Sequence, residues 1–210
     1  MQFPEPAVET AMIRDAYLFI VPMLALAVLC IWFGLSVAAL ALLFLAAFVG
    51  YFFRNPAREI PAGDNLIVSP ADGKVVRVAS LPEGQGISIF LNIFDVHVNR
   101  APIGGELEQV EYRRGRFKVA FDEEASRVNE QNILSIRGQR IRVVVKQIAG
   151  LIARRVVCWK RPGHFLERGE LFGLIRFGSR VDVILPKEVK LLVKVGDRVK
   201  GGSSVIGELI

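Results

Sequence analysis

The sequence predicts a mostly β domain preceded by an N-terminal hydrophobic helical hairpin. Two observations support this expectation. Between Asp15 and Arg54 lie 38 residues without a charged side chain, whereas the sequence after Pro56 breaks into short apolar or alternating runs separated by Gly and Pro. Runs of that length and spacing are typical of an all-β barrel or sandwich. With 210 residues, the chain is long enough for one domain with its own core and an appendage.

The uncharged segment is too long for a single membrane span. As one helix it would measure about 57 Å at 1.5 Å per residue, against a hydrocarbon core of roughly 30 Å. A Gly-Leu-Ser break at 34–36 leaves two short apolar spans, Ala16–Phe33 and Val37–Phe53, of 18 and 17 residues. We therefore expect residues 1–53 to form a helical hairpin in the membrane, followed by a β-rich domain over residues 54–210. The alternative is one span with an interfacial extension.

The flanking charges predict the orientation of this hairpin. Arg14 precedes the first span, Arg54 and Arg58 follow the second, and the turn between the spans carries no charge. The positive-inside rule then places both ends of the hairpin, and the domain that follows it, in the cytoplasm. We expect a protein of the cell (inner) membrane whose β domain faces the cytoplasm.

The globular part of the chain is basic. The chain has 27 Lys and Arg against 21 Asp and Glu, and only Arg14, Glu5, Glu9 and Asp15 among these precede Arg54, so the remainder carries a net charge of +8. A basic domain tethered beside a bilayer suits an anionic lipid surface. A nucleic-acid partner is not expected, because the charge is scattered, without aromatic-basic interleaving or a sequence typical of a recognition helix.

The two cysteines indicate neither a disulfide framework nor a metal site. Cys30 lies in the uncharged segment and Cys158 in a strand-like run. A reducing compartment is consistent with this usage.

The expected strands follow one another closely after Pro56, and Phe94–Val98 is expected to form a short turn. Apolar or alternating runs with Gly or Pro between most of them predict strands at Leu66–Val68, Lys74–Val78, Ile87–Asn92, Arg140–Ile148, Arg154–Trp159, Leu171–Arg176, Val181–Leu185 and Lys190–Val193.

A short pattern occurs twice near the C-terminus. GHFLERGELFGLI (163–175) and GDRVKGGSSVIGEL (196–209) both place an aliphatic residue three positions, and a second Gly six positions, after the first Gly. Glycine permits a tight, partly left-handed turn, and the aliphatic residue would enter the core. The pattern resembles the hairpin of biotinyl and lipoyl domains and of other barrel-sandwich hybrids, which predicts that fold. No lysine flanked by methionines is present, so a carrier role has no support.

Three residues are candidates for chemistry. Ser179 follows Gly178 in RFGSRVDVILP, where the simple interpretation is a turn and the sharper one is a serine placed for nucleophilic attack. His97 lies among polar residues where a strand should end, whereas His164 occupies a turn position. Asp72 lies in Pro-Ala-Asp-Gly, which could also be a plain type I turn.

A set of motifs resembles the short class of phosphatidylserine decarboxylases. The motifs are FFRNPAREIP, IVSPADGKV, FLNIFDVHVNRAPIGGEL, ASRVNEQN, QIAGLIARR and RFGSRVDVILP, and the resemblance runs from about Phe52 to the C-terminus. The hydrophobic hairpin resembles the N-terminal anchor of that family. This resemblance implies a pyruvoyl enzyme that converts phosphatidylserine to phosphatidylethanolamine after cutting itself between Gly178 and Ser179.

By motif match, the resemblance assigns Asp72, His97 and Ser179 to the self-processing triad of the family. His97 would take the Ser179 hydroxyl proton, and Asp72 would hold the imidazole in the useful tautomer. The hydroxyl would attack the Gly178 carbonyl to form an ester, whose elimination leaves a dehydroalanine that hydrolyses to a pyruvoyl group. That ketone would condense with the substrate amine and accept the electrons left by CO₂, with His97 as the proton donor.

The resemblance also implies partners: a phospholipid substrate and a non-covalent heterodimer of chains 1–178 and 179–210. No metal is expected. The residues that hold the phosphate stay open, and Arg100, Arg180 and Lys74 are only basic residues close to the motifs.

Three alternatives stay open at this point. A second Gly-Ser pair at 202–203 would release only eight residues. The non-enzymatic alternative is a membrane-anchored barrel-sandwich adaptor or lipid-binding protein that never self-processes. A decarboxylase of an archaetidylserine-like lipid would use the same headgroup chemistry.

Overall fold

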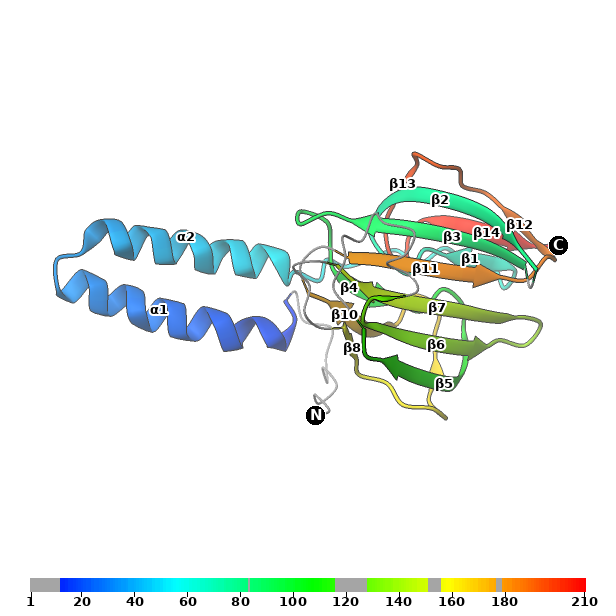
Figure 1. Ribbon diagram of the computed structural model, residues 1–210, viewed down its shortest axis with the longest axis horizontal. Coiled ribbons are helices and arrows are strands. Elements are labelled where there is room, and N and C mark those ends of the chain that lie inside the picture. The colour runs from blue at the N-terminus through cyan, green and yellow to red at the C-terminus, as the bar shows by residue number, and fades with distance from the viewer. Residues whose placement is uncertain (1–11, 83, 116–127, 151–155, 177–178) are drawn as a thin grey trace. The chain divides into compact units, whose positions relative to one another are not determined.

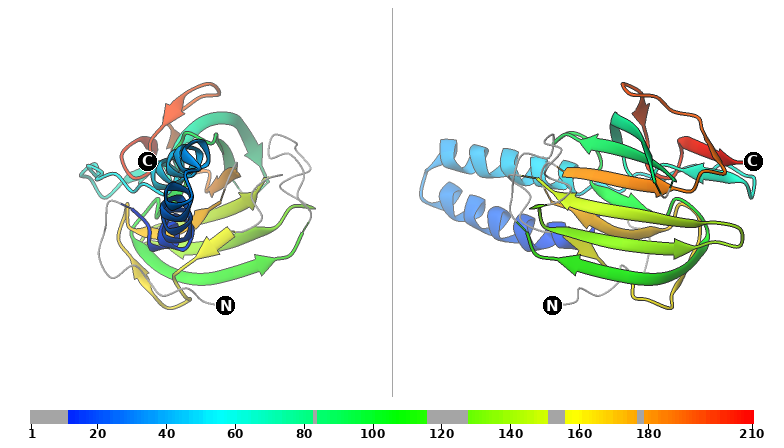
Figure 2. Two further views of the ribbon diagram at one scale, coloured as in Figure 1. Left: turned by 90° about the vertical axis from the view of Figure 1, so that its left-hand side faces the viewer. Right: turned by 45° about the vertical axis from the view of Figure 1, so that its right-hand side comes forward.

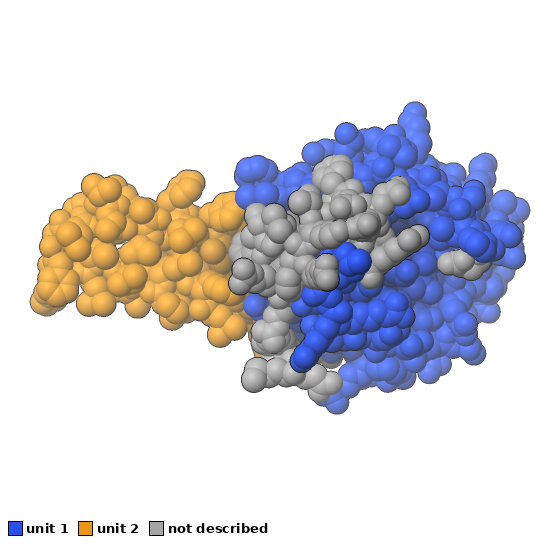
Figure 3. Space-filling model, in the orientation of Figure 1, with its two compact units in different colours: residues 1–5, 58–210 blue, residues 6–57 orange. Residues whose placement is uncertain are grey.

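The computed structural model describes residues 12–82, 84–115, 128–150, 156–176 and 179–210. The chain separates into two compact units (Figure 3). One holds the described residues up to Ala57 and the other holds Arg58–Ile210.

The first unit is a helical hairpin. A 3-10 turn η1 (Arg14–Ala16) leads into α1 (Tyr17–Trp32), and α2 (Ser36–Phe52) returns antiparallel to it (Figure 1). The turn uses Gly34 at φ +74°, a left-handed conformation that favours glycine. At the open end the Ile13 amide donates to the Phe53 carbonyl, 3.0 Å away. The expected break is confirmed, because no single helix spans the apolar segment.

Length and composition distinguish the two helices. The continuous helical segment Arg14–Trp32 has 19 residues and is long and apolar enough to cross a membrane, whereas Ser36–Phe52 is shorter. This is a weak indication of membrane association. The expectation of two spans is therefore still a prediction.

The second unit is the β unit, and the expected mostly β fold is confirmed. Its eight-stranded sheet has the order β13-β2-β3-β11-β7-β6-β5-β9, and two three-stranded sheets have the orders β1-β14-β12 and β4-β10-β8. The large sheet curls (Figure 2). The strands are β1 (Leu66–Val68), β2 (Gly73–Leu81), β3 (Gly84–Leu91), β4 (Val98–Arg100), β5 (Gly105–Arg113), β6 (Gln131–Arg137), β7 (Arg142–Ala149), β8 (Val156–Cys158), β9 (Phe165–Leu166), β10 (Leu171–Ile175), β11 (Ser179–Leu185), β12 (Val189–Leu191), β13 (Arg198–Val199) and β14 (Val205–Leu209).

The β unit consists of two halves that repeat the same arrangement of strands, which we call the pseudo-repeat. Strands β1–β3 match β4–β6 and strands β7–β10 match β11–β14, because exchanging these sets reproduces the order of all three sheets. Local details repeat as well. β13 pairs with the start of β2 as β9 pairs with the start of β5, and both β2 and β5 carry an irregularity two residues into the ladder.

The twice-occurring glycine pattern corresponds to this repeat. Gly163, Gly169, Gly196 and Gly202 all have positive φ, between +81° and +102°. The aliphatic residues between them, Leu166 on β9 and Val199 on β13, are buried in the core. The turns therefore use glycine for its left-handed conformation and the aliphatic residue as a core plug, as the sequence predicts.

The core lies between the large sheet and the two smaller ones. Alternate residues of the long strands point into it, as Val181, Val183 and Leu185 do on β11. This period-two alternation is what one buried face of a sheet requires. It also fixes the side on which every other residue of β11 lies, including Ser179.

Candidate active site

Ser179 is the first residue of β11 and faces the core. It pairs with Leu91 of β3 and Ala149 of β7, and it shares the inward side of β11 with Val181. Its side chain is fully buried, and its hydroxyl has no hydrogen-bond partner among the described residues. A buried hydroxyl without a partner is costly and calls for an explanation, of which a catalytic role is one. Gly178, the other half of the expected cleavage site, lies outside the described residues.

His97 lies at the same end of the β unit. It immediately precedes β4, and its carbonyl accepts a hydrogen bond of 3.1 Å from the amide of Ile175, the last residue of β10. The chain leaves β10 at Ile175 and enters β11 at Ser179, only four residues later. The topology therefore brings His97 to the end of the sheet at which Ser179 begins.

The tautomer of His97 follows from one contact. Its Nδ1 lies 2.9 Å from the Asp95 carbonyl oxygen. A carbonyl oxygen only accepts, so Nδ1 must carry the hydrogen, and in the neutral ring the lone pair is on Nε2. An imidazole in this state is prepared to take a proton at Nε2. The ring is buried, which keeps competing water away.

Asp72 lies in the turn before β2 and binds two other groups. Its carboxylate accepts hydrogen bonds of 2.8–2.9 Å from the Arg58 guanidinium and one of 2.8 Å from the Gly201 amide. The Arg58–Asp72 pair is mostly shielded from solvent. The structure thus brings Asp72 to Arg58 and to the Gly201 turn, while the carbonyl of Asp95 holds the imidazole. The triad role of Asp72 is still a prediction.

The pseudo-repeat shows that the Asp72 turn does not need an aspartate to form. Val199 pairs with Gly73 in one half as Leu166 pairs with Gly105 in the other, so Asp72 corresponds to Gly104. The same two halves exchange backbone hydrogen bonds, from Arg100 to Pro70 and from Val68 to Pro102. Because glycine serves at the equivalent position, a carboxylate is not required for a turn of this kind.

A chain of buried amides joins the two layers beside the site. The Gln147 side chain of β7 donates 2.8 Å to the Asn99 Oδ1 of β4 and accepts 3.0 Å from Asn132 of β6. Asn99 is two residues from His97, and Gln147 is two residues from Ala149, the partner of Ser179. These amides fix the strand after His97 against the sheet that carries Ser179.

Sequence reasoning missed these supporting residues, although some signals were present. Arg58, Asp95, Asn99 and Asn132 all lie within the quoted motifs, but a motif does not state which residues meet in space. Gln147 also lies within a quoted motif. A further signal for it was available, because it is a polar residue at an inward position of a core strand.

The other basic and histidine candidates have clear positions. Arg180 binds Asp182 through two contacts of 2.6 and 2.8 Å and lies on the opposite side of β11 from Ser179. Arg100 is buried and donates 2.8 Å to the Gly169 carbonyl. Lys74 and His164 are exposed, and His164 lies in the turn before β9.

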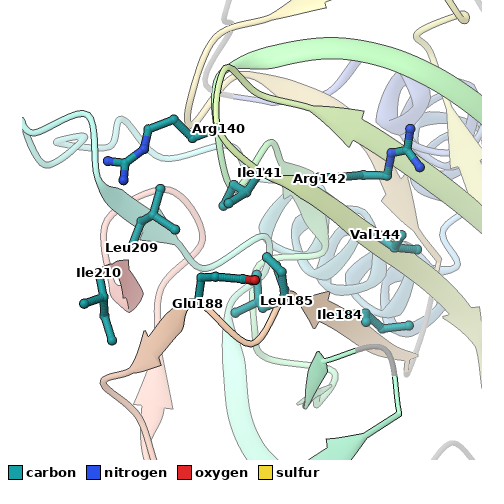
Figure 4. Close-up of a pocket in the computed structure, with 10 residues that line it drawn as sticks. Arg140, Ile141, Arg142, Val144, Ile184, Leu185, Glu188, Leu209 and Ile210 are labelled. Atoms are coloured by element: carbon teal, nitrogen blue, oxygen red, sulfur yellow. The ribbon is translucent and has the colours of Figure 1, made fainter.

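A pocket of about 500 Å³ lies at the other end of β11 (Figure 4). Its lining includes Arg140 and Arg142 beside the β6–β7 turn, Leu185, and the C-terminal Ile210. Ser179 and Leu185 are six residues apart on one strand, a span of about 20 Å at 3.4 Å per residue. The pocket is therefore separate from the site around Ser179.

Among the described residues, no three of the His, Cys, Asp and Glu side chains gather as metal ligands would. Cys158 is partly buried against the core, and desolvation raises the pKa of its thiol to about 11.

Several known proteins are similar in sequence to this chain. The sequence profile described as phosphatidylserine decarboxylase matches residues 45–207. The chain is 53% identical over 184 residues to a phosphatidylserine decarboxylase proenzyme of Solibacter usitatus, covering 87% of this chain and 89% of that protein. The proenzyme of Carboxydothermus hydrogenoformans is 47% identical over 210 residues, covering 94% of this chain and 96% of its own length. That of Syntrophus aciditrophicus is 50% identical over 171 residues, covering 76% and 79%.

Proposed function

Because the chain belongs to the phosphatidylserine decarboxylase family, we propose that it converts phosphatidylserine to phosphatidylethanolamine with release of CO₂. The observation that carries this proposal at the residue level is Ser179, a buried hydroxyl without a hydrogen-bond partner among the described residues, at the end of the sheet where His97 lies. The similar proteins are named proenzymes, which supports maturation by cleavage.

We propose that the chain cleaves itself between Gly178 and Ser179. Nε2 of His97 takes the Ser179 hydroxyl proton, and Oγ attacks the Gly178 carbonyl, so that the peptide bond becomes an ester. Elimination across Cα and Cβ of Ser179 releases the Gly178 carboxylate. The remaining dehydroalanine is hydrolysed with loss of ammonia, which leaves a pyruvoyl group at the start of chain 179–210.

The residues around Ser179 fit such a group. A pyruvoyl group occupies about the volume of the serine that it replaces, so the buried inward position of Ser179 holds it without a new cavity. When formed, the group supplies an electrophilic ketone that accepts the electron pair left by departing CO₂. His97, which immediately precedes β4, is the residue that we assign to return a proton to the carbon that lost CO₂.

Asp72 is assigned to the same site as a positioning residue. Its carboxylate joins Arg58 and the Gly201 amide to the turn that precedes β2. The Arg100 amide, three residues after His97, binds the Pro70 carbonyl of the same turn at 2.9 Å. The Asp72 turn is therefore hydrogen-bonded to β4, the strand that follows His97, and this link supports the predicted triad.

The membrane assignment is part of the proposal. Residues 1–53 serve as the anchor and residues 54–210 as the catalytic domain, which works on the cytoplasmic face of the inner membrane as a non-covalent pair of chains 1–178 and 179–210. The apolar helix and the arginines flanking the hairpin support this orientation.

The test of the proposed function is release of labelled CO₂ from phosphatidylserine labelled in the serine carboxyl group. The wild-type protein should release CO₂ and form phosphatidylethanolamine, and Ser179→Ala should release none above background. Activity in Ser179→Ala equal to that of the wild type would overturn the proposal.

A further inference from the structure

A turn beside the site presents two apolar side chains to solvent. The turn Asn92–Asp95 joins β3 to β4, and its two central residues, Ile93 and Phe94, are 45% and 63% exposed. Large apolar side chains at neighbouring positions of one tight turn form a small protruding hydrophobic tip. We propose that this tip, Ile93–Phe94, inserts into the bilayer surface and docks the active site on the membrane.

The turn is built to hold these side chains outward. The Asn92 side chain accepts from the Phe94 amide at 2.8 Å, the Asp95 side chain accepts from the Asn92 amide at 2.8 Å, and the Asp95 amide donates to the Asn92 carbonyl at 3.0 Å. The polar side chains at both ends of the turn are thus bound to its own backbone. A rigid tip loses little conformational entropy on insertion.

The tip is connected directly to both reactive residues. Leu91, three residues before Phe94, is the strand partner of Ser179, and His97 follows Phe94 by three residues. Three residues of chain span at most about 11 Å. The carbonyl of Asp95, the last residue of the turn, is the group that holds Nδ1 of His97. Insertion of the tip therefore brings the reaction centre close to the headgroup plane.

Exposed cations lie beside the tip and point to an anionic lipid surface as its partner. Arg198 of β13 is 3.2 Å from Asp95 and has an exposed side chain. It pairs across the sheet with Lys74, which is exposed, and Lys200 follows two residues later on the exposed side. Apolar side chains flanked by Arg and Lys match the acyl and phosphate layers of a bilayer surface.

This inference rests on the proposed function, because a membrane-docking tip is useful to an enzyme whose substrate is a lipid. Its first test measures membrane contact and does not require enzymatic activity. In the full-length protein with Cys30→Ser and Cys158→Ser, a spin label is placed at Phe94→Cys, with Phe165→Cys as the control. Phe165 is 70% exposed but lies on β9, the edge strand at the other side of the large sheet. The protein is reconstituted in vesicles of phosphatidylglycerol and phosphatidylcholine.

The label at position 94 should be more accessible to oxygen, and less accessible to a polar nickel chelate, than the label at position 165. Equal accessibility to the nickel chelate at both positions would overturn the proposal. Shielding of position 94 from both reagents, in detergent as well as in vesicles, would show a protein contact instead and would also overturn it.

A second arm connects the tip to the reaction. The variant Ile93→Ser/Phe94→Ser should lower the ratio of the rate on vesicles to the rate on a short-chain, water-soluble phosphatidylserine by about tenfold, since two exposed apolar side chains no longer partition. The control Phe165→Ser/Ile210→Ser, which removes two exposed apolar side chains elsewhere, should leave that ratio unchanged. An unchanged ratio in the tip variant would contradict the proposal. Absence of CO₂ release from both substrates in the wild type and in both variants would count against the proposed function alone.

Discussion

At the scale of single residues, we expect both proposed reactions to depend on the imidazole of His97. The carbonyl of Asp95 fixes its tautomer, and burial protects it from water. His97→Ala should therefore leave a folded, uncleaved chain. His164→Ala is the matched control, because it removes the other histidine, an exposed one, and should cleave normally. Denaturing electrophoresis checks both variants, and cleavage in His97→Ala but not in His164→Ala would reverse the assignment.

The role of Asp72 in cleavage can be distinguished from that of its partner Arg58 by comparing two substitutions. Asp72→Asn should slow cleavage by at least about tenfold, because the neutral amide weakens the charge-assisted contacts that join Asp72 to Arg58 and to the Gly201 amide. Arg58→Met removes the cation and leaves the carboxylate.

If Asp72 acts on the site itself, Asp72→Asn should slow cleavage more than Arg58→Met does. If only the ion pair matters, the two variants should slow cleavage equally, and the double variant should be no slower. The measurement is the rate at which newly synthesised protein converts to two chains.

Cys158 provides a test of how β8, the neighbour of β10, packs against the core, where the thiol is partly buried. Burial raises the pKa of its thiol to about 11, so at neutral pH the folded protein holds it as the unreactive neutral form. In a Cys30→Ser protein, alkylation of Cys158 should be slow at pH 8 and should rise toward pH 11, whereas the unfolded chain should react readily near pH 8.5. The rate is followed by mass spectrometry. Rapid alkylation of the folded protein at pH 8 would contradict the buried position.

At the scale of elements, the hairpin and the β unit should have separable roles. The β unit has its own core, and Asp72 follows Phe53 by 19 residues, which span at most about 70 Å. Deletion of residues 1–53 should leave self-cleavage intact in soluble protein. It should preserve decarboxylation of a short-chain substrate and lose most of the rate on vesicles, the more so at high salt, which screens the attraction of the +8 domain.

The assay for this deletion is CO₂ release from both substrates at two ionic strengths. Equal vesicle rates for the truncated and full-length proteins would show that the hairpin does not deliver the site to its substrate.

Local sequence patterns predicted some elements well and others not at all. The apolar runs at β1, β10 and β11 were found because burial leaves a direct period-two or continuous pattern. The strands β5 and β6 were missed because polar residues hide the alternation. Glu, Gln and Arg lie on the exposed face of β5, and β6 begins with the buried polar residues Gln131 and Asn132. The glycine turns were found because a left-handed backbone restricts the residue type.

The candidate site shows the same division. Ser179 and His97 were identified from motifs. The structure adds that both residues lie at the same end of the sheet. The partners of Asp72 could not be predicted, since Arg58 and Gly201 are 14 and 129 residues away along the chain. Contacts at such separations are set by the sheet topology, which no local pattern contains.

At the scale of the whole molecule, the fold of the β unit has pseudo-two-fold symmetry, but its candidate reactive residues do not repeat. The two halves repeat strand for strand, but Asp72 has only Gly104 as its counterpart, and Ser179 lies at one end of β11. The opposite end of that strand carries the pocket beside Arg140 and Arg142. The halves also differ in the connections between their strands, since two residues separate β2 from β3 whereas 17 separate β5 from β6. The candidate reaction centre therefore occurs once on a pseudo-symmetric scaffold.

The central claim is that Ser179 is consumed to make the reactive group, and intact mass spectrometry under denaturing conditions tests it most directly. The wild-type protein should give two chains, 1–178 and 179–210, the smaller one lighter by one ammonia than a chain that begins with serine. Ser179→Ala should give a single full-length chain of unchanged or slightly higher thermal stability, because a methyl group replaces a buried hydroxyl without a partner among the described residues. A single intact chain in folded, aged wild-type protein would contradict the account.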